Sequence, residues 1–180
     1  MLNIKQQKEL LKIARASVEA YVSGGKAPDF KITGEALNKK QGAFVTLTKN
    51  GRLRGCIGQI APSNQPLWQL IQEMAIAAAS QDNRFNPVSR DELGELEYEI
   101  SVLSAPEVIG DWRKIKLGEH GVIIRKSGRS GVFLPQVATE TGWDLEKFLS
   151  ELCLEKAGLA PDAYKDKNTE IKIFTAQVFK

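Results

Sequence analysis

An Asn-Gly pair between two strand-like runs places the strongest constraint on the fold of this chain. Residues 43–48 (AFVTLT) are rich in β-branched side chains, and residues 53–60 (LRGCIGQI) follow the pair closely. Asn50 and Gly51 both accept positive φ angles, which the two-residue turn of a β-hairpin requires. The sequence therefore predicts an antiparallel hairpin, and its returning strand contains an unusual glycine-flanked cysteine.

Three other segments of the first half carry periodic patterns. Residues 6–22 and 66–80 place apolar side chains at helical spacing, and residues 96–103 alternate apolar with polar residues as a half-buried strand does. Alanines on the far side of residues 66–80 predict that this helix is buried on more than one face.

The second half of the chain repeats this order of elements. Residues 121–126 and 132–136 predict another hairpin around a glycine-containing turn at 127–131, residues 143–157 predict a helix, and residues 170–179 predict a closing strand. Short strands joined by hairpins and interspersed with helices favour an α+β fold over a parallel doubly wound sheet. No flexible linker interrupts the pattern, so we expect one domain over residues 1–180, with an internal duplication.

Composition excludes several classes of protein. The apolar fraction of 42% and the charged fraction of 26% are typical of globular chains. The net charge of +3 is spread along the chain, without the concentrated cations and interleaved aromatics of a nucleic-acid-binding surface. No stretch approaches the roughly 20 apolar residues of a membrane span. Few cysteines and no export signal predict a cytoplasmic protein. Nucleic-acid binding is the weakest of the functions considered, because only the basic balance of charge supports it, and no membrane association is expected.

The glycine-flanked cysteine, Cys56, has two interpretations. Glycine within a strand marks a bulge or the close approach of a backbone or a ligand. In one interpretation, amides near Gly55 and Gly58 face an anionic group, and Arg54 adds charge and lowers the pKa of the Cys56 thiol. In the other, Cys56 is a small buried apolar side chain and the glycines permit tight packing. The residues alone leave both open.

Few other side chains are candidates for chemistry. His120 is the only histidine and therefore the only imidazole base available for a Cys–His pair, although a lone histidine is commonly a turn residue. Asp82 and Arg84 flank a helix end, where they cap it, pair with each other or line a cleft. Cys153 is on the apolar face of its predicted helix, which indicates a core position. Two distant cysteines and one histidine predict no metal site, and no cofactor motif is present.

Residues 53–58 (LRGCIG) resemble the hallmark of the AMMECR-type family, named after the AMME chromosomal region. The resemblance covers nearly the whole chain and continues in order through residues 82–85 (DNRF), 99–104 (EISVLS), 118–121 (GEHG) and 134–136 (LPQ). It implies an α+β fold made of two lobes, with antiparallel or mixed sheets packed around central helices. It also implies that the LRGCIG segment borders a cleft between the lobes, which forms a binding or active site.

The resemblance implies which residues of this chain form the site and which proteins are its partners. Cys56 and His120 are the implied catalytic candidates. The implied ligand-binding residues are Leu53, Arg54, Gly55, Ile57, Gly58, Asp82, Arg84 and Gln136. Prokaryotic members resemble one component, component A, of a set with Memo-like and radical-SAM proteins, which are therefore the expected partners. The family implies no established activity. We expect a cleft that binds a small ligand or a partner, and the alternative is a thiol-dependent enzyme that uses Cys56 with Arg54 and His120.

Overall fold

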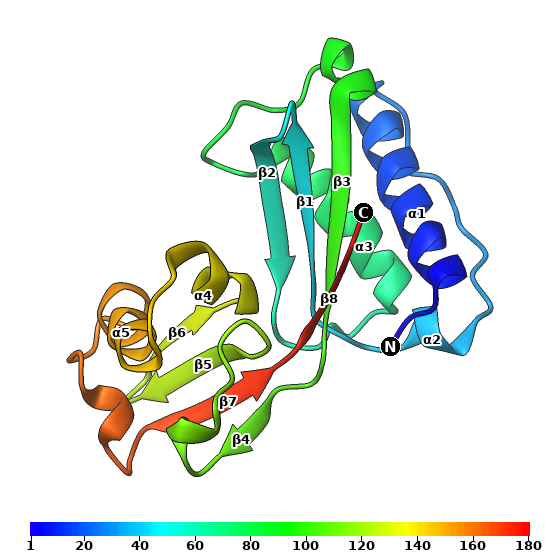
Figure 1. Cartoon of the computed structure of the whole chain (residues 1–180). Coiled ribbons are helices and arrows are strands. Elements are labelled where there is room, and N and C mark those ends of the chain that lie inside the picture. Colours follow the sequence, from blue (N-terminus) through cyan, green and yellow to red (C-terminus); the bar gives the residue numbers. More distant parts are fainter. The chain divides into compact units, whose positions relative to one another are not determined.

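The computed structural model describes all 180 residues, which form two compact units. The first unit comprises residues 1–103 and 177–180, and the second comprises residues 104–176. Each contains a four-stranded antiparallel sheet with helices packed on it (Figure 1). The predicted α+β fold is therefore confirmed. None of the helices combines the length and the apolar character that a membrane-spanning helix needs.

In the first unit, two helices pack together on one face of the sheet (Figure 1). The sheet has the strand order β2-β1-β3-β8. Side chains of the long helices and of the inner sheet face form the core, including Leu10, Val45 and Leu47, each 0% exposed. The elements are α1 (Ile4–Val22), α2 (Glu35–Asn38), β1 (Ala43–Lys49), β2 (Arg52–Gln59), α3 (Leu67–Ser80), η1 (Arg90–Glu95), β3 (Leu96–Leu103) and β8 (Ala176–Phe179).

The hairpin of β1 and β2 has the turn that the Asn-Gly pair predicts. Asn50 and Gly51 have φ angles of 51° and 71°. The register is regular except at one point: Thr48 pairs with Leu53 and Leu47 pairs with Gly55. Arg54 is therefore the extra residue of a β-bulge, a feature that commonly redirects a side chain.

The second unit has the sheet order β4-β7-β5-β6. Its hairpin turns at Ser127 and Gly128, whose φ angles of 49° and 78° repeat the left-handed pair of the first hairpin. The elements are β4 (Glu107–Ile109), η2 (Trp112–Lys114), β5 (Gly121–Lys126), β6 (Arg129–Phe133), α4 (Pro135–Thr141), α5 (Leu145–Glu151), the π-helical turn η3 (Leu152–Lys156), η4 (Ala163–Lys165) and β7 (Glu170–Phe174).

The two sheets have the same strand order relative to their hairpins. Read from the hairpin outward, the orders are β2-β1-β3-β8 and β6-β5-β7-β4. The fourth strand of each sheet, however, follows the third strand of the other: β4 comes after β3 in the chain, and β8 comes after β7. The chain therefore passes from the first unit to the second after β3 and returns after β7. This return places the C-terminus in the first unit (Figure 1).

Some predicted boundaries in the second half are wrong. The strand predicted over residues 132–136 ends at Phe133, and Pro135 begins α4, because proline without an amide hydrogen suits the first turn of a helix. The helix predicted over 143–157 becomes π-helical after Glu151. The closing strand over 170–179 is interrupted at Thr175, where the chain passes from β7 to β8.

Candidate functional site

Cys56 lies on the face of the first sheet opposite α1 and α3, which we call the Cys56 face. It pairs with Thr46 of β1, and the Thr46 hydroxyl lies 3.2 Å from Cys56 Sγ with geometry for a hydrogen bond. Thr46 in turn pairs with Glu99 of β3, so these three side chains form one row across the sheet. Cys56 is half-buried and is not part of the apolar core of its unit.

The two glycines of the LRGCIG segment are explained by packing. A Cβ atom at Gly55 would lie 2.1 Å from the carbonyl oxygen of Ala78 in α3. A Cβ atom at Gly58 would lie 2.4 Å from both the Ala43 carbonyl oxygen and Phe44 Cγ on the paired strand. Backbone atoms approach Gly55, and backbone and ring atoms approach Gly58, so only glycine fits at either position without a shift. A ligand-binding role for these amides stays a prediction.

Asp82 and Arg84 cover the edge of β2 beside Cys56. The Cys56 amide donates to Asp82 Oδ2 at 2.8 Å, and the Cys56 carbonyl accepts from Arg84 Nη2 at 3.5 Å. The two side chains also form an ion pair at 2.7 Å, as the sequence suggested. A carboxylate and a guanidinium thus occupy the places that the C=O and N–H groups of another strand would take.

The Asp82 carboxylate is strongly held in its ionised form. Its side chain is 5% exposed, whereas that of Arg84 is 57% exposed. Hydrogen bonds from Arg84, together with the amide of Cys56, keep the pKa of Asp82 well below its usual range despite the opposing effect of burial. The backbone of the LRGCIG segment is therefore tied to a buried negative charge.

Arg54 makes contacts within the first unit. Its Nε and Nη2 atoms each donate to Glu92 at 2.9 Å, and its remaining bonds go to the carbonyl oxygens of Asn86 and Pro87. The hydrogen bonds that Arg54 donates, together with one from the Ser89 backbone amide, lower the pKa of Glu92 to about 2. The charge of Arg54 is paired with Glu92, so its principal contact is a carboxylate rather than the Cys56 thiol.

The other predicted residues are dispersed. Leu53 is 42% exposed near the hairpin turn, and Ile57 packs against the core of the first unit. His120 belongs to the second unit, where its Nδ1 accepts from the Lys116 amide at 3.2 Å. Gln136 also belongs to the second unit, at the start of α4.

Cys153 is 0% exposed, as its apolar helix face predicts. Burial raises the pKa of this thiol. No group of three or more His, Cys, Asp or Glu side chains in the structure is placed to hold a metal ion.

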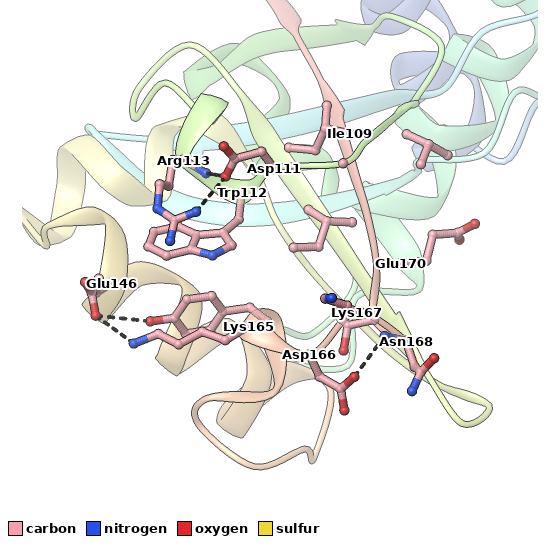
Figure 2. Close-up of a pocket in the computed structure, with 15 residues that line it drawn as sticks. Ile109, Asp111, Trp112, Arg113, Glu146, Lys165, Asp166, Lys167, Asn168 and Glu170 are labelled. Atoms are coloured by element: carbon pink, nitrogen blue, oxygen red, sulfur yellow. Dashed lines mark hydrogen bonds and ion pairs between the residues drawn. The ribbon is translucent and has the colours of Figure 1, made fainter.

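One feature of the second unit was missed by sequence reasoning. A pocket of about 890 Å³ is lined by residues 108–113, by Glu146 and by residues 164–171 (Figure 2). Trp112 and Tyr164 meet in it edge to face, with ring centroids 5.1 Å apart. In the sequence, Trp112 is followed by the basic residues of 113–116 (RKIK), and nothing there indicates that Tyr164 is near.

Comparison with known proteins identifies the family. The sequence profile of the AMMECR1 family matches residues 11–179. This chain belongs to the AMMECR1 family. A protein of Methanothermobacter thermautotrophicus is 41% identical over an alignment of 187 positions, which covers 99% of this chain and 95% of that protein. Protein NEQ441 of Nanoarchaeum equitans is 43% identical over an alignment of 181 positions, which covers 95% of this chain and 98% of that protein.

A solved structure supports the AMMECR1 fold. The crystal structure of the uncharacterised protein PH0010 from Pyrococcus horikoshii is similar to this chain with a TM-score of 0.84 and 42% identity. The similarity covers 94% of this chain and 88% of the Pyrococcus chain. The family predicted from residues 53–58 is thereby confirmed.

Proposed function

We propose that this AMMECR1 protein is a binding protein whose binding surface is the Cys56 face, and that it acts in the cytoplasm with Memo-like and radical-SAM proteins. The row of Cys56, Thr46 and Glu99 on the sheet face opposite the helices carries this proposal. A half-buried thiol beside a hydroxyl and a carboxylate offers apolar and polar contacts to one occupant. The cleft implied by the family resemblance stays a prediction.

The contacts around the LRGCIG segment support a rigid binding platform. Asp82 and Arg84 hold the outer edge of β2 beside Cys56, and Arg54 ties the bulge to Glu92. Gly55 brings β2 against the backbone of α3. A surface fixed before binding loses little conformational entropy when its partner arrives, and this raises affinity. In this proposal the charged residues of the segment maintain the surface, and Cys56 contacts the bound partner.

The binding proposal is tested by protection of Cys56 from alkylation. The native 180-residue chain is treated with N-ethylmaleimide, with and without a Memo-like protein encoded in the same genome, and modification is followed by mass spectrometry. Cys56 is expected to react before the fully buried Cys153, which reacts only on unfolding. A matched variant, Lys12→Cys, carries an exposed thiol on α1, on the other side of the sheet.

We expect the Memo-like protein to slow the alkylation of Cys56 and to leave the alkylation rate of the Lys12→Cys thiol unchanged. Equal slowing at both thiols would indicate non-specific association and contradict it. Unchanged alkylation of Cys56 at saturating concentrations of the Memo-like protein and of a radical-SAM protein would remove both as occupants of the Cys56 face.

Thiol-dependent catalysis is the second proposal, favoured by the Thr46 hydroxyl beside Cys56 Sγ at 3.2 Å. A hydroxyl that donates to sulfur stabilises a thiolate, the reactive form of cysteine. Against this proposal, Arg54 is paired with Glu92, and Nδ1 of His120 accepts a bond from a backbone amide. A pH profile of the alkylation rate tests it: a midpoint well below the free-thiol value of about 8.5 favours catalysis. A thiol that is inert until the protein unfolds excludes it.

A further inference from the structure

The pocket of the second unit has the dimensions of a small-molecule site and includes none of the predicted site residues. Its volume of about 890 Å³ falls in the range of roughly 300–1,000 Å³ that is typical of ligand sites. It lies between β4, the turn before η2, and the loop at residues 166–169 that leads into β7. All its lining residues belong to the second unit, so the pocket is complete within it.

An aromatic pair forms one side of the pocket. The rings of Trp112 and Tyr164 are 5.1 Å apart at an interplanar angle of 85°, which fixes the orientation of the indole. The Arg113 guanidinium carbon lies 4.8 Å from the centroid of the Trp112 ring. Trp112 is only half-buried in spite of these contacts. A half-buried indole held in one orientation is a surface on which a planar ring can stack.

The carboxylates that line the pocket already have cationic partners. Asp166 pairs with Lys126 at 2.7 Å, and Glu170 pairs with Lys172 at 3.1 Å, and neither lysine lines the pocket. The other two lining carboxylates are paired inside it, Glu146 with Lys165 at 3.1 Å and Asp111 with Arg113 at 3.3 Å.

Lys167 is the lining cation that remains without an ion-pair partner, and it is exposed. The lining contains four carboxylates and three cations. Because Lys126 and Lys172 pair with two of the carboxylates from outside the lining, Lys167 is the one positive charge left over, and it favours an anionic occupant. In Figure 2, Trp112 and Arg113 are drawn on one side of the pocket, and Lys167 and Asn168 on the other.

We propose that this pocket binds a small planar aromatic molecule with a single negative charge. The ring contacts the indole of Trp112, and the acidic group is attracted by the ammonium of Lys167. A small molecule with both a ring and an acidic group matches the Trp112 indole and the Lys167 ammonium simultaneously. The Cys56 face is in the other unit, so the proposal is independent of the proposed function, and either can fail alone.

The test compares two probes that share a ring and differ in charge. Naphthalene-1-sulfonate is an anion, and naphthalene-1-sulfonamide is its neutral analogue. Each is titrated into the ¹⁵N-labelled full-length chain, and the indole N–H signals of the three tryptophans are followed by NMR. A Trp112→Phe variant assigns the relevant signal. The sulfonate is expected to shift the Trp112 signal, to leave Trp68 unshifted and to bind more tightly than the sulfonamide.

Two lysine variants test the role of the charge. Lys167→Gln is expected to weaken binding of the sulfonate by about two- to fivefold, the usual effect of one exposed charge pair, and to leave the sulfonamide unaffected. Lys156→Gln removes an exposed lysine of the same unit that does not line the pocket, and it is expected to change neither affinity. Equal affinity for both probes, equal effects of the two variants, or an unshifted Trp112 signal would each overturn the proposal.

Discussion

The backbone amide of Cys56 donates a 2.8 Å hydrogen bond to the carboxylate of Asp82, 26 residues later in the chain. This hydrogen bond joins two segments that are separate in the sequence, the LRGCIG segment and the DNRF segment at residues 82–85. Because β2 is at the edge of its sheet, its outward amides need partners from outside the sheet. Asp82 and Arg84 supply these partners at Cys56, so the LRGCIG and DNRF segments form one structural feature.

Replacement of Asp82 by asparagine is expected to destabilise the chain. The asparagine side chain would retain a carbonyl acceptor for the Cys56 amide but lose the charge that binds Arg84. Because the Asp82 side chain is 5% exposed, the loss is expected to be about 1–3 kcal/mol in the free energy of unfolding, measured by urea denaturation. Asp29→Asn is the matched control, since Asp29 is exposed and has no ion-pair partner. Equal stability of the two variants would show that the Asp82 contacts contribute little.

The pair of Arg54 and Glu92 predicts a specific dependence of stability on pH. The pKa of Glu92 is lowered from 4.5 to about 2 in the folded chain, so the unfolded chain binds the proton more readily. The stabilisation is therefore complete above about pH 4.5 and is lost as the pH falls towards 2.

Glu92→Gln removes this titration. At neutral pH we expect the variant to be less stable by about 2 kcal/mol, a value reduced for the partial exposure of the pair. The difference from the unmodified chain should shrink steadily between pH 4.5 and 2, as measured by urea unfolding at each pH. A difference that is independent of pH over this range would contradict an ionic role for Glu92.

Gly55→Ala tests the close contact between β2 and α3. The added methyl group would lie 2.1 Å from the Ala78 carbonyl oxygen, and backbone on both sides limits relaxation. We expect a loss of about 3 kcal/mol or more in unfolding free energy, or failure to fold. Gly94→Ala is the control, because a methyl group there meets nothing within 4 Å, and its effect should stay within about 0.5 kcal/mol. A stable Gly55→Ala variant would show that the helix can move away from the strand.

The two hairpin turns allow a reciprocal exchange of residues. Asn50 and Ser127 occupy equivalent left-handed positions, with φ angles of 51° and 49°, and asparagine tolerates this conformation better than serine. Ser127→Asn is therefore expected to raise the unfolding free energy by about 0.5 kcal/mol, and Asn50→Ser to lower it by about the same amount. Thermal unfolding followed by circular dichroism measures both, and changes of the same sign would refute the equivalence of the turns.

Local chemistry explains why much of the fold was predictable. The left-handed preference of Asn50 and Gly51 fixed the first hairpin, and the alternation of residues 96–103 matched β3 residue for residue. Periodicity also located α1 and α3 to within two residues at each end. The sequence pattern is less informative after Phe133, where it predicts a strand through Pro135 although the missing amide hydrogen of proline favours a helix start.

The sequence alone therefore determined the family, the hairpins, the long helices and a core position for Cys153, because these depend on neighbouring residues and on periodicity. Tertiary structure decided the rest. The partnership of Arg54 with Glu92 depends on a bulge and on the short helix η1, in which Glu92 lies 38 residues later in the chain. The pocket beside Trp112 depends on the ring of Tyr164, which belongs to the distant short helix η4. Side-chain contacts between distant segments form only when the chain is folded, and a single sequence contains no local signal for them.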